Sequence, residues 1–128
     1  MRIGALAAAT GTTTRTLRYY EQEGLLDSSR TASGYRDYVD GALLRVRNIR
    51  ELLATGFTIN DVRAFLDYLD RDLPPTFADF GGCTTAIRVA EERLTLLCER
   101  IQALTRLHDS VAARLDRPAF GSHAAEVH

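Results

Sequence analysis

Apolar and polar positions at the start of the chain follow the pattern of two short helices joined by a turn. Ile3, Leu6 and Ala7 are spaced so that they share one side of a helix. This spacing predicts a helix over Ile3–Thr10, and Gly11 is the residue type that commonly follows a helix end. A second helix is expected directly after this turn.

The second predicted helix begins near Thr12 or Thr13, because a threonine side chain can cap the exposed N–H groups of a helix start. It continues through Tyr20 and stops before Gly24. Leu17 and Tyr20 are three positions apart, so both side chains can face the interior of the protein.

The outward side of this helix then presents Arg15, Arg18 and Tyr19. Two guanidinium groups and an aromatic hydroxyl suit contacts with DNA phosphates and base edges. On an ordinary helix the same residues would form a solvated polar side. The helix and turn that precede it favour DNA binding, because a helix-turn-helix motif fits its second helix into the major groove of DNA.

A turn-rich stretch, residues 28–38, is interpreted as a small β-wing. Its Ala32-Ser33-Gly34 run predicts a tight turn, since glycine tolerates positive φ. Side chains alternate along a strand, so Tyr35 and Arg36 fall on opposite faces of the returning strand. We expect Tyr35 to pack and Arg36 to reach the DNA backbone.

Another pair of helices follows. Residues 42–54 carry a broad apolar stripe, and Gly56 ends that helix. Thr58 is expected to cap the next helix, with Asp61 three positions on as the acid of a capping box. The inward positions of that next helix are Ile59, Val62, Phe65, Leu66 and Leu69.

A hinge and a long helix complete the pattern. Pro74 and Pro75 exclude a continuous helix, and Gly81-Gly82 ends the connecting loop. Beyond them, residues 84–116 predict one long helix with apolar residues spaced alternately by three and four over four heptads. The predicted dimerisation seam consists of Ile87, Ala90, Leu94, Leu97, Ile101, Leu104, His108, Val111 and Leu115. A single helix would expose the apolar side chains of this seam to water, so two such helices must pair.

The composition adds little to this picture, but it excludes a membrane-spanning protein. The formal net charge is −1, but residues 1–63 hold nine arginines against seven acids, and residues 64–128 hold seven against ten. The chain has no apolar run of about 18 residues, so no membrane span is predicted. Cys83 and Cys98 are too far apart on one helix to form a disulfide, which favours a cytoplasmic location.

Four segments, IGALAAATG, TTTRTLRYYEQEGLL, SGYRDY and IRELLATGFTINDVRAFL, resemble the MerR family of bacterial transcription regulators. The resemblance covers about the first 70 residues. It implies an all-α fold with a small β-wing, in which a winged helix-turn-helix precedes a second helix pair and a long antiparallel coiled-coil dimerisation helix. It also implies a homodimer that binds double-stranded promoter DNA, distorts it, and acts with RNA polymerase at the promoter.

This resemblance divides the chain into a DNA-binding domain (residues 1–72), a hinge (73–83), the dimerisation helix (84–116) and a short tail (117–128). Arg47, on the helix after the wing, is a further candidate for a phosphate contact. The predicted DNA-contacting residues are Thr13, Thr14, Arg15, Arg18, Tyr19, Arg36, Tyr38 and Arg47.

The signal to which such a regulator responds is not evident from the sequence. Cys83 begins the long helix, and relatives that sense metals or thiol-reactive agents often carry a cysteine there, so it is the candidate sensor. A metal site built from Cys83 and His123 is the less favoured alternative, and a purely structural cysteine is the simplest one. No cofactor is predicted. Cys98 is expected to pack beside the seam.

An enzyme and a protein-interaction adaptor are the two alternatives to a DNA-binding protein. An enzyme would need a converging acid, base or nucleophile set, and the chain has no glycine-rich phosphate loop, HExxH motif or Ser/His/Asp cluster. A coiled-coil protein-interaction adaptor without specific DNA binding is the stronger rival. An adaptor, however, has no need for Arg15, Arg18, Tyr19 and Arg36 on one surface.

Overall fold

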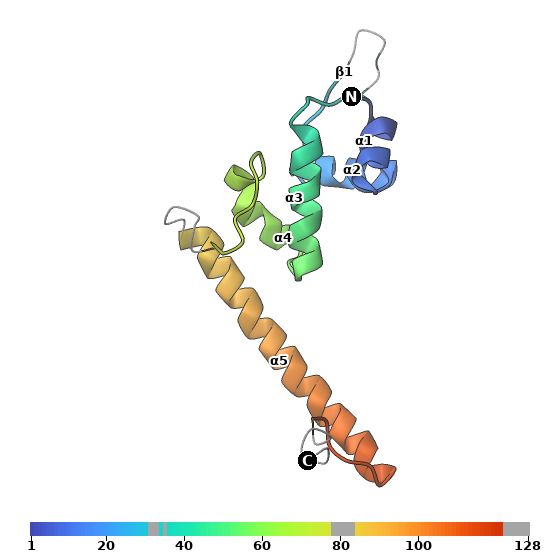
Figure 1. The fold of residues 1–128 in the computed structure, drawn as a ribbon, viewed down its shortest axis with the longest axis vertical. Coiled ribbons are helices and arrows are strands. Elements are labelled where there is room, and N and C mark those ends of the chain that lie inside the picture. Colours follow the sequence, from blue (N-terminus) through green and yellow to red (C-terminus); the bar gives the residue numbers. More distant parts are fainter. Residues whose placement is uncertain (31–33, 35, 78–83, 122–128) are drawn as a thin grey trace. The chain divides into compact units, whose positions relative to one another are not determined.

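The computed structural model describes residues 1–30, 34, 36–77 and 84–121, and these are mostly helical, as predicted (Figure 1). The elements in chain order are α1 (Ile3–Thr10), α2 (Thr14–Gln22), β1 (Ser29–Arg30), β2 (Arg36–Asp37), α3 (Ala42–Thr55), α4 (Ile59–Val62), the 3-10 helix η1 (Arg63–Tyr68) and α5 (Thr84–Arg114). The chain forms two compact units, Met1–Ala90 and Glu91–His128. The predicted division into four segments stays a prediction. None of the described helices is long and apolar enough to cross a bilayer.

The core of the N-terminal unit is built around α3, which lies between the α1–α2 pair and α4 (Figure 1). Every surrounding helix contributes side chains that are fully buried in this core. Those with 0% exposure include Leu6, Leu17, Leu25, Val46, Ile49, Val62, Phe65 and Leu69. Ala86, in the first turn of α5, is also completely buried in this cluster. The helix-turn-helix is therefore one side of a larger core and not an independent motif.

The turn between α1 and α2 depends on Gly11, whose φ of 68° is left-handed. The N–H of Thr12 reaches back to the Ala7 carbonyl at 3.0 Å, which closes the end of α1. Arg50 of α3 donates a hydrogen bond to the Thr10 carbonyl at the same helix end. Thr10 is buried, and its hydroxyl donates to the Leu6 carbonyl at 2.7 Å.

The second helix of the α3–α4 pair begins at the predicted cap, but its later part is a 3-10 helix and not an α-helix. Thr58 and Asp61 form a reciprocal capping box, with hydrogen bonds of 3.0 and 3.1 Å. The α-helix ends at Val62, and η1 continues as a 3-10 helix to Tyr68. Val62 and Phe65, three positions apart across this change, are both fully buried.

Aromatic packing closes the far end of this unit. Phe57, Phe65 and Phe77 contact one another with ring centroids 5.2 to 5.7 Å apart, at tilted angles that favour aromatic attraction. A pocket lined by Phe77, Phe80 and Phe120 is a further possibility that the sequence leaves open. Phe77 is instead part of the core packing, and Phe80 lies outside the described residues.

Two short strands follow α2. β1 and β2 pair antiparallel, with Ser29 opposite Asp37 and Arg30 opposite Arg36. Gly34 between them has a φ of 83°, the left-handed conformation expected of a turn glycine. The Tyr38 N–H donates to the Met1 carbonyl at 2.7 Å, and Arg2 forms a β-bridge with Asp37. The residues before α1 therefore hold the base of the strand pair.

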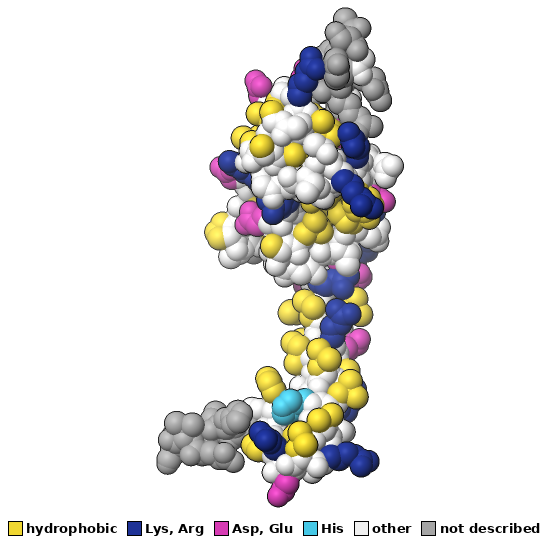
Figure 2. All heavy atoms as spheres, turned by 90° about the vertical axis from the view of Figure 1, so that its right-hand side faces the viewer, with side chains coloured by type: hydrophobic (Ala, Val, Ile, Leu, Met, Phe, Trp, Pro, Cys, Tyr) yellow, Lys and Arg dark blue, Asp and Glu magenta, His cyan; other side chains and the backbone are white. Residues whose placement is uncertain are grey.

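The C-terminal unit exposes a large number of apolar side chains along α5, as Figure 2 shows. Exposure is 64% for Leu94 and 59% for Leu104, and an exposed apolar surface of this extent commonly marks an interaction site. Other exposed apolar residues of this unit are Leu96, Ile101, Leu107, Val111, Leu115 and Phe120. Cys98 is exposed in the single chain, and its expected packing beside the dimer seam stays a prediction.

The segment after α5 folds back on the helix. Asp116 adopts a left-handed φ of 54°, and the Arg117 N–H donates to the Ala112 carbonyl at 2.8 Å. The Phe120 N–H then donates to Asp109 Oδ1 at 2.8 Å, while its ring meets His108 edge-on at 5.4 Å. The Phe120 N–H, and after it the His108 ring, hold the pKa of Asp109 below its usual range.

Replacing Gly11 by alanine tests the turn of the helix-turn-helix. A Cβ there would lie 3.2 Å from Arg50 Nη1 and would force a non-glycine residue into left-handed φ. We expect Gly11→Ala to lower the free energy of unfolding by about 1–2 kcal/mol in urea denaturation. Gly4→Ala is the control: Gly4 lies in α1 with nothing within 4 Å, so alanine should stabilise by up to about 1 kcal/mol. Equal effects of both changes would contradict this description of the turn.

Candidate nucleic-acid interface

The start of α2 is shaped by Thr13. Its side-chain oxygen accepts a hydrogen bond from the Thr16 N–H at 3.1 Å, the arrangement of an N-cap. Its hydroxyl also donates to the Thr16 hydroxyl at 3.0 Å. The helix therefore begins at Thr14, one or two residues after the predicted start.

The two sides of α2 are separated as the sequence predicted. Leu17 and Tyr20 are buried, at 0% and 4% exposure, and anchor the helix in the core. Burial raises the pKa of the Tyr20 hydroxyl, an effect that the nearby Arg50 partly offsets. Arg15, Arg18 and Tyr19 are exposed on the opposite side.

These exposed side chains line one shallow groove on the protein surface. Arg15, Arg18 and Tyr19 share it with Thr16 and Gln22, which the sequence prediction missed. Neither guanidinium forms an ion pair with any described acid, so both keep their hydrogen-bond donors available. Gln22 follows Arg18 by four positions, so helical periodicity alone would have placed it on this side.

The end of α2 is held as firmly as its start. Gly24 adopts a φ of 75°, and the Leu25 N–H donates to the Tyr20 carbonyl at 2.9 Å, a Schellman-type helix end. Arg63, at the start of η1, donates to both the carbonyl and the carboxylate of Glu23. The helix that carries Arg15, Arg18 and Tyr19 on its exposed side is therefore held by hydrogen bonds at both ends.

Four further residues are predicted to contact DNA: Thr14, Arg36, Tyr38 and Arg47. Arg47 is exposed on α3 but is not among the residues that line the groove of α2, and Thr14 is half-buried. Arg36 is the first residue of β2, and its side chain lies outside the described part of the chain. Tyr38 is only 2% exposed. A DNA contact by the Tyr38 side chain does not fit this burial, because the aromatic ring fills the core beneath the strand pair.

The candidate sensor residues cannot be placed. Cys83 and His123 both lie outside the described residues. Within the ranges that the structure describes, no group of three or more His, Cys, Asp or Glu side chains is arranged to hold a metal ion.

Comparison with known proteins agrees with this geometry. The profile of the family described as "MerR HTH family regulatory protein" matches residues 1–69. An HTH-type transcriptional activator SoxR homolog from Chromobacterium violaceum is 38% identical over 109 residues, which are 85% of this chain and 70% of the relative. A nodulation protein NolA from Bradyrhizobium sp. (strain NC92) is 48% identical over 67 residues, but these are 52% of this chain and only 28% of that protein.

A solved structure extends the similarity beyond the matched region. The transcription regulator PbrR691 from Ralstonia metallidurans CH34, determined in complex with lead(II), superposes with a TM-score of 0.71 at 27% identity. The superposition covers 88% of this chain and 83% of PbrR691. By the family profile and the SoxR homolog, the chain belongs to the MerR family of helix-turn-helix regulatory proteins.

Proposed function

We propose that this chain is a sequence-specific transcription regulator that binds a promoter operator as a homodimer and distorts the DNA. One observation carries the proposal: Arg15, Arg18 and Tyr19 are exposed together on a helix whose other side is buried in the core. A helix of this kind in the major groove can place arginines on phosphates and guanines and Gln22 on an adenine edge.

The strand pair β1–β2 is proposed to act as the wing beside this helix. Its base is tied to the residues before α1 through the Met1 carbonyl and the Arg2–Asp37 bridge. Because α1 leads directly into the turn before α2, the wing and the reading helix are attached to the same short segment. Arg36 of β2 is the residue proposed to reach the phosphate backbone.

The exposed apolar side of α5 is proposed to be the dimer interface. Leu94, Ile101 and Leu104 are each at least 59% exposed in the single chain, although burying a leucine stabilises by roughly 1.5–3 kcal/mol. Pairing with a second copy would cover these residues. Of the predicted seam, Ala90 already packs against the core of its own N-terminal unit, so the inter-chain contact is expected to be concentrated beyond it.

The main test measures binding of the 128-residue chain to the DNA upstream of its own gene at two salt concentrations. An unrelated duplex of equal length serves as the control. Specific binding that weakens steeply with salt supports a regulator that neutralises phosphates. No binding at low salt would contradict the proposal and favour the coiled-coil adaptor.

Arg18→Ala is expected to weaken operator binding by about 1–3 kcal/mol, because a phosphate or base contact is lost. The free energy of unfolding should hardly change, since Arg18 is exposed and forms no ion pair with a described acid. Fluorescence anisotropy with labelled operator measures the dissociation constant. Arg114→Ala, an exposed arginine in the last turn of α5, removes the same charge and should bind like the wild type. An unchanged dissociation constant for folded Arg18→Ala would contradict the assignment of α2.

Leu104→Glu is expected to convert the dimer into a monomer, because it places an unpaired charge in the proposed seam. Sedimentation velocity measures the change, and DNA affinity should fall with it since two half-sites are no longer held together. Gln102→Glu adds the same charge at an exposed position outside the seam and should leave the dimer intact. An intact Leu104→Glu dimer would mean that the seam lies elsewhere on α5.

The proposed distortion of DNA has its own measurement. Footprinting of the bound operator should reveal hypersensitive bases at the centre, between the two half-sites, because these base pairs are deformed without being contacted. Circular permutation of the site should show altered mobility for the bent complex. A uniform footprint on straight DNA would contradict the distortion and leave simple operator binding in place.

A further inference from the structure

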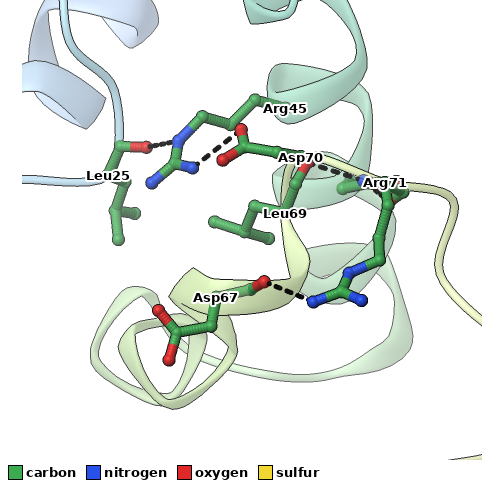
Figure 3. A network of polar contacts seen from close by, with 7 residues as sticks. Leu25, Arg45, Asp67, Leu69, Asp70 and Arg71 are labelled. Carbon is green, nitrogen blue, oxygen red and sulfur yellow. Dashed lines mark hydrogen bonds and ion pairs between the residues drawn. The ribbon is translucent and has the colours of Figure 1, made fainter. Parts of the chain in front are cut away.

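Arg45 of α3 joins two segments of the N-terminal unit that are far apart in sequence (Figure 3). Its Nε donates to the Leu25 carbonyl at 2.7 Å, and its Nη1 donates to Asp70 Oδ1 at 2.9 Å. Leu25 closes the end of α2, and Asp70 begins the segment that follows η1 and leads towards α5. One guanidinium therefore bonds both to the residue that closes the end of α2 and to the segment that follows η1.

Asn48 holds the second of these segments from the same side of α3. It is only 3% exposed, and its side-chain amide donates to the Leu69 carbonyl at 2.9 Å and to the Arg71 carbonyl at 2.7 Å. Its two acceptors flank Asp70 in the chain. Since Arg45 and Asn48 are three positions apart, α3 presents both donors on one face.

The Leu25 contact acts on α2 through backbone geometry. The Leu25 N–H is already bonded to the Tyr20 carbonyl, and its own carbonyl accepts from Arg45. A positive charge at the C-terminal end of a helix is also favoured by the helix dipole. A displacement of Asp70 that moved the Arg45 guanidinium would consequently pull on the last turn of α2.

We infer that Arg45 is a positioning residue through which the segment after η1 controls the setting of α2 on DNA. The inference rests on the proposed DNA binding and adds a regulatory connection to it. Arg45 does not touch DNA in this scheme. It transmits the position of Asp70, and hence of the chain leading to α5, to the helix that carries Arg15 and Arg18.

The chemistry of the side chain suits this task. Arg45 is 19% exposed, whereas Asp70 is 71% exposed, so the arginine is fixed by the protein while its acidic partner remains at the surface. The planar guanidinium supplies donors in two fixed directions, and a lysine ammonium could not reproduce that fork. An exposed ion pair contributes little to folding, so the Asp70 contact can be altered without unfolding the unit.

The test is a double-mutant cycle with Arg45→Met and Asp70→Asn in the 128-residue chain. The probe is the DNA upstream of its own gene, with a fluorescent base analogue at the centre of the footprint. Two quantities are measured: the dissociation constant, and the fluorescence change at saturating protein. The second reports DNA distortion and is insensitive to weaker affinity or to a smaller folded fraction. Arg71→Met is the matched control, because Arg71 lies in the same segment and its side chain donates only locally, to the Asp67 carbonyl.

Arg45→Met is expected to weaken binding about two- to thirty-fold and to reduce the fluorescence change at saturation. Asp70→Asn should shift both quantities in the same direction by less, and the double variant should match Arg45→Met alone. Arg71→Met should behave like the wild type. A wild-type fluorescence change in either single variant would overturn the inference, as would additive effects in the double variant. If the wild-type chain itself does not bind this DNA, the proposed function fails, and this inference fails with it.

Discussion

The burial of α3 between the helix-turn-helix and the second helix pair is the constraint on which the N-terminal unit depends. Val46 and Ile49 of α3 are completely buried against both neighbours, and the first turn of α5 completes the same core through Ala86. No element of the unit has a hydrophobic core of its own. The groove on α2 and the base of the strand pair therefore keep their geometry only while this shared core is intact.

Arginine serves two opposite purposes in this unit. Arg15 and Arg18 are exposed and form no ion pair with a described acid, which leaves their donors available for a polyanion. Arg45 and Arg63 instead bond to the protein itself, because they donate to the main-chain carbonyls of Leu25 and Glu23. The guanidinium group suits both tasks, because it stays charged and has donors in several fixed directions.

The helices and their buried sides could be predicted from the sequence because their signals are local. Apolar spacing located α1 and the inward face of α2, and the Thr58–Asp61 pair identified the start of α4. These features depend on residues within one or two turns of each other, so they survive without knowledge of the fold.

Features that depend on distant partners were missed or misplaced. Tyr38 was predicted to contact DNA, yet it is only 2% exposed and belongs to the hydrophobic core of the N-terminal unit. Arg45 donates hydrogen bonds to the Leu25 carbonyl, 20 residues earlier, and to the Asp70 carboxylate, 25 residues later. No local sequence pattern indicates either partner.

The shortness of α2 has a consequence for how the protein meets DNA. A helix of nine residues is too short to be stable in water by itself, so it exists only as part of the folded unit. A duplex that binds this helix then binds the folded state selectively, and mass action must raise the stability of the whole core as DNA is added. The affinity of the chain for an operator and the stability of its core are therefore thermodynamically linked. A better site on the chromosome would compensate for a weaker interior, and a chain with a damaged core would retain its fold longest where it is already bound.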